Sequence, residues 1–126
     1  MREFTQRSNN QQASFPVVVV GAGPVGLALA VDLAQRNIDV VLIDQKTKVG
    51  RGSRAVTFSK RSLEIFDKLG VGDQITDHGT QWSISRTYFG DEMIDAKNLQ
   101  PEQGLKRPAY VNLQQYHVED YLVQRG

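Results

Sequence analysis

A glycine-rich hexapeptide near the start of the chain contains the residue types that best suit phosphate binding. It consists of Gly21, Ala22, Gly23, Pro24, Val25 and Gly26. The first glycine lets the chain leave a strand through a tight turn, and the second has no Cβ to obstruct a pyrophosphate. The third lets a following helix pack closely against a sheet. Free N–H groups and the positive dipole at the start of that helix favour a phosphate by about 0.3–2 kcal/mol.

An acidic residue, Asp44, follows Gly21 after 23 positions and can accept hydrogen bonds from both hydroxyls of an adenosine ribose. Hydrogen bonds to a charged group contribute about 1.5–3 kcal/mol. The same carboxylate would repel a 2′-phosphate, so we expect an unphosphorylated ribose, which belongs to NAD or to the AMP half of FAD. Lys46 and Lys48 are interpreted as solvated loop residues. The alternative is a tight strand–helix connection in an α/β protein without a ligand.

The elements around this turn predict a strand–helix–strand unit. Residues 15–20 (FPVVVV) and 38–44 (IDVVLID) are apolar on both faces, which is typical of buried parallel strands. Between them, residues 24–37 indicate a helix, with Asn37 suited to a left-handed C-terminal cap. Its expected buried stripe contains Ala22, Val25, Leu29 and Leu33. The fold class is therefore α/β, with a Rossmann-like unit and a right-handed crossover.

Two helices are expected after a polar, basic loop at residues 45–57. Residues 59–69 have an apolar side and end at Gly70, and residues 71–78 read as another helical turn.

A hairpin and a last helix complete the predicted elements. Residues 81–89 (QWSISRTYF) alternate as a strand, and Gly90-Asp91 suits a II′ turn before a return strand at residues 93–95. Residues 96–107 are expected to form a polar loop. The last helix is expected over residues 112–125, with Asn112 as its N-cap.

Composition excludes several functional classes for this 126-residue chain. Fifteen Lys and Arg against 14 Asp and Glu give a net charge of +1, so we expect no nucleic-acid or membrane partner. The absence of cysteine excludes disulfides, cysteine–zinc sites and thiol catalysis. His78 and His117 lack partners at ligand spacing, so no metal is expected. Residues 1–14 are polar and predict a disordered tail rather than a secretory signal, which favours a cytoplasmic location.

Three further motifs make the glycine-rich turn more specific. Arg54-Ala55 follows Asp44 by ten residues, and residues 61–70 (RSLEIFDKLG) form an R-x-L-E helix motif that ends in Leu-Gly. A third motif, Q-x-x-x-E-x-x-L, comprises Gln115, Glu119 and Leu122. With the turn, these motifs resemble the N-terminus of the FAD-dependent aromatic hydroxylases, over about residues 15–122. This family of single-component flavin monooxygenases includes para-hydroxybenzoate, phenol and 3-(3-hydroxyphenyl)propionate hydroxylases.

The resemblance implies cofactor-binding roles for residues outside the turn. It places Asp44 and the adjacent Gln45 at the ribose, and Arg54-Ala55 at the flavin dinucleotide. Gln115 would hydrogen-bond FAD, with Gln114 as the alternative if the register shifts by one. The family reduces FAD with NADPH or NADH and transfers one oxygen atom of O₂ to a small phenolic substrate. No catalytic residue is assigned within this chain.

Two departures from the family pattern affect what we expect of the chain. Asp44 stands where the family usually has Glu, and no later Gly-Asp motif follows a buried strand. We therefore expect residues 15–126 to form an incomplete, N-terminal portion of an FAD-binding domain, with a third strand expected after the last helix. Residues 81–95 would form a hairpin that begins a mixed substrate-domain sheet.

Several interpretations stay open from the sequence. Trp82, Tyr88 and Phe89 could suggest an aromatic substrate wall, but aromatic residues on an alternating strand favour core or cross-strand contacts. An NAD-dependent dehydrogenase or another FAD-dependent oxidoreductase could share the strand–helix–strand unit. An inactive truncated product is a further alternative, and the substrate and oligomeric state are not indicated.

Overall fold

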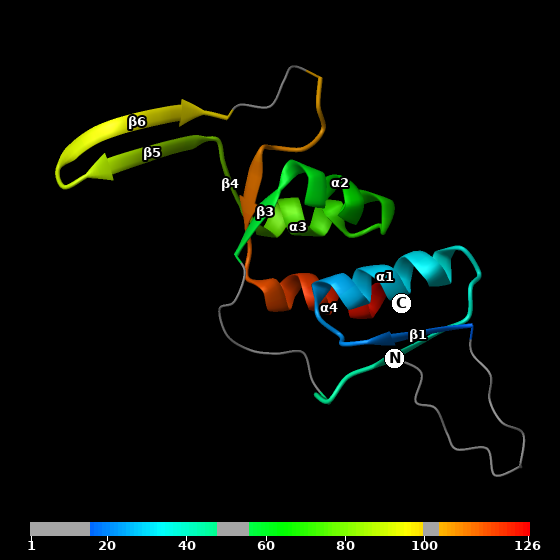
Figure 1. Cartoon of the computed structure of the whole chain (residues 1–126). Helices are drawn as coiled ribbons and strands as arrows, with labels where there is room; N and C mark the ends of the chain where they lie inside the picture. The colour runs from blue at the N-terminus through cyan, green and yellow to red at the C-terminus, as the bar shows by residue number, and fades with distance from the viewer. Residues whose placement is uncertain (1–15, 48–55, 100–103) are drawn as a thin grey trace, which may run out of the picture.

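The computed structural model describes residues 16–47, 56–99 and 104–126 (Figure 1). Within these ranges the strands form three small sheets, in the orders β1–β2, β3–β7–β4 and β5–β6. This mixture of helices and sheets confirms the α/β class. The elements are β1 (Val17–Val20), α1 (Pro24–Gln35), β2 (Val40–Ile43), β3 (Thr57–Ser59), α2 (Lys60–Lys68), α3 (Gly72–His78), β4 (Thr80–Trp82), β5 (Ile84–Phe89), β6 (Glu92–Asn98), β7 (Tyr110–Asn112) and α4 (Gln115–Arg125).

The predicted strand–helix–strand unit is confirmed by the pairing of β1 with β2. These strands run parallel, with Val17 opposite Val40. The helix that connects them, α1, begins immediately after Gly23 and has Pro24 in its first turn, where proline removes no helical hydrogen bond. It ends in the predicted left-handed cap, because Asn37 has φ 58° and its N–H donates to the carbonyl of Ala34 at 3.0 Å.

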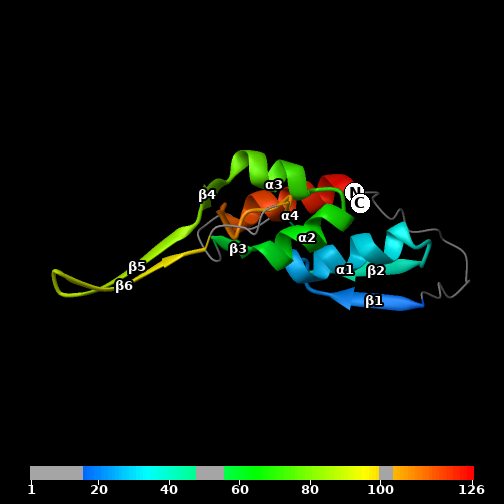
Figure 2. The ribbon, with the colours of Figure 1, turned by 90° about the horizontal axis from the view of Figure 1, so that it is seen from above.

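The prediction that these strands are buried on both faces was wrong. Val19 is buried, whereas Val18 is 56% exposed and Val20 is 79% exposed. Ile43, opposite Val20 in the pairing, is 48% exposed. Helix α1 lies over one face of the pair, and no element of the described ranges covers the other (Figures 1 and 2).

The predicted stripe on α1 was wrong at two of its four positions, since Ala22 packs against the core and Leu33 is half-buried but Val25 and Leu29 face solvent. Val25 is 83% exposed and Leu29 is exposed, while Leu27 and Val31 are buried. Leu27 lies about 200° around the helix from Val25, because each residue advances the helix by about 100°. The apolar sequence of α1 is compatible with either face, and its packing against α4 selects the side of Leu27 and Val31.

The main core lies between the three-stranded sheet and helices α2, α3 and α4. Phe58 of β3 and Phe66 of α2 meet edge to face, with ring centroids 5.9 Å apart. Burial of each such large apolar side chain contributes about 1.5–3 kcal/mol. The α2 helix begins one residue later than predicted, because Ser59 ends β3 and caps the helix, with its Oγ accepting the N–H of Ser62 at 3.4 Å. The most deeply buried core residues are Leu63, Val71, Ile75, Val111, Val118 and Leu122.

Residues 81–89 were predicted as one strand but belong to two. β4 pairs antiparallel with β7, whereas β5 pairs with β6 in a hairpin that extends away from the helices (Figures 1 and 2). The hairpin turn itself is confirmed, since Phe89 lies opposite Glu92 and Gly90 has φ 59°. The return strand is longer than predicted and reaches Asn98. Both hairpin strands are largely exposed, so burial imposes no alternation on the return strand.

Asn112 was predicted to cap the last helix, and the structure corrects this. It ends β7, and its side-chain oxygen accepts hydrogen bonds from Thr57 Oγ1 at 2.9 Å and Trp82 Nε1 at 2.8 Å. The helix starts three residues later because Asn112 is paired with both neighbouring strands. Trp82 stacks on Tyr110 with ring centroids 4.6 Å apart, which confirms its cross-strand role. No helix in the described ranges is both long enough and apolar enough to cross a membrane.

Candidate functional site

The turn after β1 has open space above its first two glycines. Gly21 has φ 103°, a left-handed conformation that favours glycine, and its N–H donates to the carbonyl of Ile43 at 2.7 Å. A Cβ added at either Gly21 or Gly23 would have no atom of the described residues within 4 Å. A ligand can therefore reach the backbone of this turn directly.

Gly26 serves a different purpose, because it allows α1 to lie against the turn and β1. A Cβ at this position would overlap the carbonyl oxygen of Gly21 and lie 3.5 Å from Cγ1 of Val19. Any larger residue would therefore push the helix away from the strand. The spacing of the three glycines thus combines an open backbone with a closely packed helix.

The start of α1 leaves backbone donors available. The first intrahelical bond runs from the N–H of Leu27 to the carbonyl of Gly23 at 2.9 Å, so the N–H groups of Val25 and Gly26 precede the helical ladder. Among the described residues, no side chain caps this end, and the first turn contains no acidic residue. These donors and the helix dipole give the end of the turn a positive partial charge suited to an anion.

Asp44 lies directly beside this turn. Its Oδ2 accepts the N–H of Ala22 at 2.6 Å, and its Oδ1 accepts the N–H of Lys46 at 2.7 Å. The hydrogen bonds from Ala22 and then Lys46 lower the pKa of Asp44 below its ordinary value, so the carboxylate is ionised at neutral pH. A carboxylate has about four acceptor positions. Asp44 therefore retains acceptor capacity for hydroxyl groups of a ligand.

Gln115 begins α4, and its Nε2 donates to Oε1 of Glu119 at 2.7 Å. Both Glu119 and Leu122, the other members of the motif, are buried. Helices α1 and α4 pack together, and their first turns lie at the same side of the molecule (Figures 1 and 2). Gln115, the first residue of α4, therefore lies at the end of α4 that is on the same side of the molecule as the glycine turn. Gln114 is exposed, and its Oε1 accepts from the hydroxyl of Tyr116 at 3.3 Å.

The structure brings together the hexapeptide and Asp44, and it places Gln115 on the adjacent helix. Gln45, the residue that follows Asp44, is exposed to solvent. Arg54 and Ala55, which the resemblance places at the flavin dinucleotide, lie outside the described residues.

A buried arginine that the sequence analysis did not identify lies away from the glycine turn, against α2 and α3. The side chain of Arg107 is only 4% exposed and contacts α2 and α3 through Asp67, Asp73 and Thr76. In the sequence Arg107 stands in a polar segment beside Lys106, and no local signal distinguishes it from a solvated residue.

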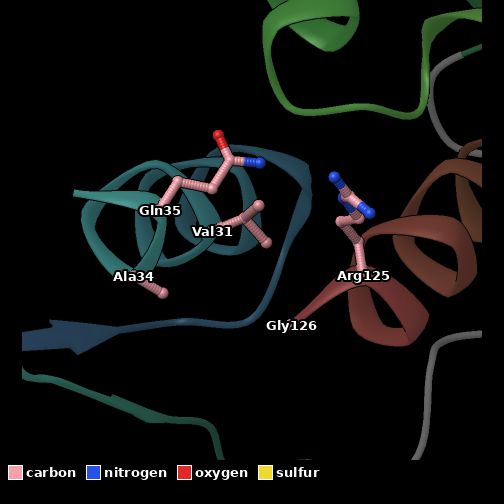
Figure 3. A pocket seen from close by; sticks show the side chains of 5 residues that line it. All are labelled: Val31, Ala34, Gln35, Arg125 and Gly126. Carbon is pink, nitrogen blue, oxygen red and sulfur yellow. The ribbon is translucent and has the colours of Figure 1, made fainter. Parts of the chain in front are cut away.

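A hollow of about 270 Å³ lies between the C-terminal ends of α1 and α4 (Figure 3). Gln35 Nε2 and Arg125 Nε line it, and both donate to the carbonyl of Leu69, at 3.2 and 3.3 Å. Because the glycine turn precedes the opposite end of α1, this hollow is separate from the candidate site.

Comparison with known proteins gives one family match across nearly all of the chain. The family described as "FAD binding domain" matches residues 14–125. Among curated relatives, a flavin-dependent monooxygenase of Mycobacteroides abscessus is 31% identical over 117 residues, which is 86% of this chain and 25% of that protein. A 3-(3-hydroxy-phenyl)propionate/3-hydroxycinnamic acid hydroxylase of Escherichia coli is 34% identical over 96 residues, or 75% of this chain and 17% of that protein. The chain therefore spans about a quarter or less of these relatives.

Two solved structures of monooxygenases contain a part with a similar fold. The p-nitrophenol 4-monooxygenase PnpA from Pseudomonas putida DLL-E4 superposes with a TM-score of 0.77 and 29% identity, over 86% of this chain and 28% of that one. The flavin-dependent monooxygenase PieE, in complex with FAD and substrate, has a TM-score of 0.72 and 24% identity, over 88% of this chain and 21% of that one. The second likeness concerns the fold alone.

Proposed function

The chain belongs to the FAD binding domain family, and on this premise we propose that the glycine turn and Asp44 bind the ADP portion of FAD. The observation that carries the proposal is the 2.6 Å hydrogen bond from the N–H of Ala22 to Asp44. It holds an ionised acceptor for ribose hydroxyls directly against a turn whose backbone is open to a phosphate.

The described residues fit this part of FAD. Open space at the Cβ positions of Gly21 and Gly23 leaves room for the pyrophosphate at the backbone. The uncapped donors at the start of α1 suit its negative charge. The remaining acceptor capacity of Asp44 suits the two ribose hydroxyls, and its charge disfavours a 2′-phosphate.

We assign the remaining contacts by their positions relative to this site. Gln45 lies next to the ribose acceptor, and Ala22, Pro24 and Val25 complete the turn. Gln115 begins the helix beside α1, and in the proposal its amide reaches toward the ribityl part of FAD. Arg54 and Ala55 are proposed to contact the pyrophosphate on the basis of the family resemblance alone.

For the whole protein we propose an NADPH- or NADH-dependent monooxygenase that hydroxylates a small aromatic substrate in the cytoplasm. Bound FAD would supply the electron transfer and oxygen activation. The residues of this chain would hold and orient the nucleotide end of the cofactor. The support is the family match together with relatives that are named as monooxygenases and hydroxylases.

The test is an equilibrium titration of FAD with the chain, in which the quenching of flavin fluorescence reports binding. NAD is then added as a competing nucleotide. We expect FAD to bind and Asp44→Ala to weaken it by about tenfold or more, as the loss of hydrogen bonds to a charged group predicts. Glu64→Ala removes a carboxylate from the surface of α2 and is the matched control. Binding of NAD but not FAD would favour a dehydrogenase and contradict the proposal.

A further inference from the structure

We propose that Arg107 is a positioning residue for FAD, because it fixes the segment that carries Gln115 into its place beside the glycine turn. This inference rests on the proposed function, in which Gln115 contacts the flavin side of the cofactor. Arg107 itself lies in a different part of the molecule and touches neither Asp44 nor the turn in the described contacts.

Every nitrogen of the Arg107 guanidinium has a partner on α2 or α3. Nε donates to Oδ2 of Asp67 at 2.7 Å, and Nη2 also donates to Oδ1 of Asp67. Nη2 further donates to Oδ1 of Asp73 at 2.7 Å, and Nη1 donates to Oγ1 of Thr76 at 2.8 Å. We refer to Arg107 with these three partners as the arginine clamp. Bidentate pairing of this kind fixes orientation as well as distance.

The clamp is built into the packing of both helices. Thr76 is buried, and its hydroxyl donates to the carbonyl of Gly72 at 2.9 Å. A Cβ at Gly72 would overlap the Asp67 carboxylate and lie 2.9 Å from Nη2 of Arg107. The space for the guanidinium thus depends on a glycine at the start of α3.

Arg107 holds the beginning of the segment that leads to Gln115. β7 starts three residues after it, and α4 starts three residues after β7 ends. The carbonyl of Ala109 accepts the N–H of Lys60 at 2.9 Å, and the N–H of Leu113 donates to the carbonyl of Val56 at 2.7 Å. The clamp therefore supplies a side-chain anchor before a short central strand.

Such an anchor is needed because the apolar pattern alone permits a shift. Ala109, Val111 and Leu113 alternate, so a slip of β7 by two residues would keep small or apolar side chains on the core face. A two-residue slip would move the start of α4 by about 6–7 Å. Asn112 opposes this slip from the other side of the segment through Thr57 and Trp82. Arg107 opposes the same slip by binding α2 and α3, which pack outside the three-stranded sheet.

The experiment compares the affinities of the chain for FAD and for ADP. In the proposal ADP contacts the turn, Asp44 and the other residues assigned to the ribose and pyrophosphate, whereas only FAD also reaches Gln115. We expect Arg107→Met to weaken FAD binding at least fivefold and to leave ADP binding within twofold. Gln115→Ala should show the same pattern, and the double variant should be no weaker than the poorer single variant. Arg61→Met, which removes an exposed arginine of α2, is the matched control and should change neither affinity.

A general structural role for Arg107 would lower both affinities together, and that result would overturn the inference. Unchanged FAD binding in Arg107→Met, or additive losses in the double variant, would also overturn it. If Arg107→Met does not fold, Asp73→Asn removes one charged partner on an exposed position and should show a smaller loss confined to FAD. Failure of the unmodified chain to bind ADP or FAD would instead overturn the proposed function on which this inference rests.

Discussion

Asp44 accepts the backbone N–H of Ala22 at 2.6 Å, across 22 positions of sequence. The bond joins the turn after β1 to the end of β2, so the two features singled out in the sequence form one structural unit. The second carboxylate oxygen accepts the N–H of Lys46 at 2.7 Å. Asp44 is therefore oriented by the backbone before any ligand binds, which reduces the ordering cost of ligand binding.

Replacement of Asp44 by Asn separates the charge of this residue from its shape. The variant keeps one acceptor oxygen but loses the charge, so we expect FAD to bind about tenfold more weakly at pH 7. Fluorescence titration measures the change, and unfolding by urea checks that the chain remains folded. An affinity equal to that of the unmodified chain would contradict the role of the charge at the ribose.

Acid should weaken the link between Asp44 and Ala22. The backbone donors lower the pKa of Asp44 in the folded chain, so its contribution to stability is present above the unfolded value of about 3.8. It is lost as pH falls through the lower folded value. We expect the difference in unfolding free energy between the unmodified chain and Asp44→Asn to shrink as pH falls below about 3.8. A difference that does not change with pH would contradict this assignment.

Alanine at Gly23 should impair ligand binding, whereas alanine at Gly26 should impair stability. Gly23→Ala places a methyl group in open space at φ −77°, so the fold should be retained while the approach of a pyrophosphate is blocked. Gly26→Ala overlaps the carbonyl of Gly21 and should destabilise the chain by about 1–3 kcal/mol. Denaturant unfolding and FAD titration of both variants distinguish the effects. Loss of stability in Gly23→Ala with intact binding would reverse the assignment.

Asn112 is expected to be more important for stability than its position in a short strand suggests. Asn112→Leu removes the acceptor of the hydrogen bonds from Trp82 and Thr57 and should cost about 0.5–1.5 kcal/mol, because both donors stay partly accessible to water. Thr57→Val removes one of these donors and leaves the bond from Trp82 in place, so its cost should be smaller. Circular dichroism during thermal unfolding compares the two variants. An equal loss of stability in the two variants would show that the indole bond contributes little and would contradict this prediction.

The uncovered face of β1 and β2 should promote self-association of the chain. Val20 and Ile43 lie opposite one another and are both exposed, and exposed edges and apolar surfaces favour association. We expect Val20→Lys to increase the fraction of monomer measured by light scattering. Ile65→Lys introduces the same charge at an exposed apolar residue of α2, away from this face, and is the control. An equal effect of both substitutions would indicate a general benefit of charge rather than a contact at this face.

The sequence alone determined the features that depend on backbone conformation at single residues. The three glycines, the proline in the first helical turn and Asn37 in the left-handed region each follow from backbone sterics, and all were predicted. The II′ turn at Gly90 follows from the same cause. The order strand, helix, strand predicted the α/β class, and the match over residues 14–125 confirmed the family that the motifs resemble.

Only the tertiary structure decided which apolar face is buried and which polar residues have partners. The faces of Val25 and Leu27 on α1 are both apolar, and the packing of α4 selected one of them. Asn112 could have capped a helix, but donors from two neighbouring strands hold it in β7. Arg107 looked like a solvated residue because its three partners are 31 to 40 positions away in the sequence. Contacts over such separations depend on how the helices meet, which no local pattern records.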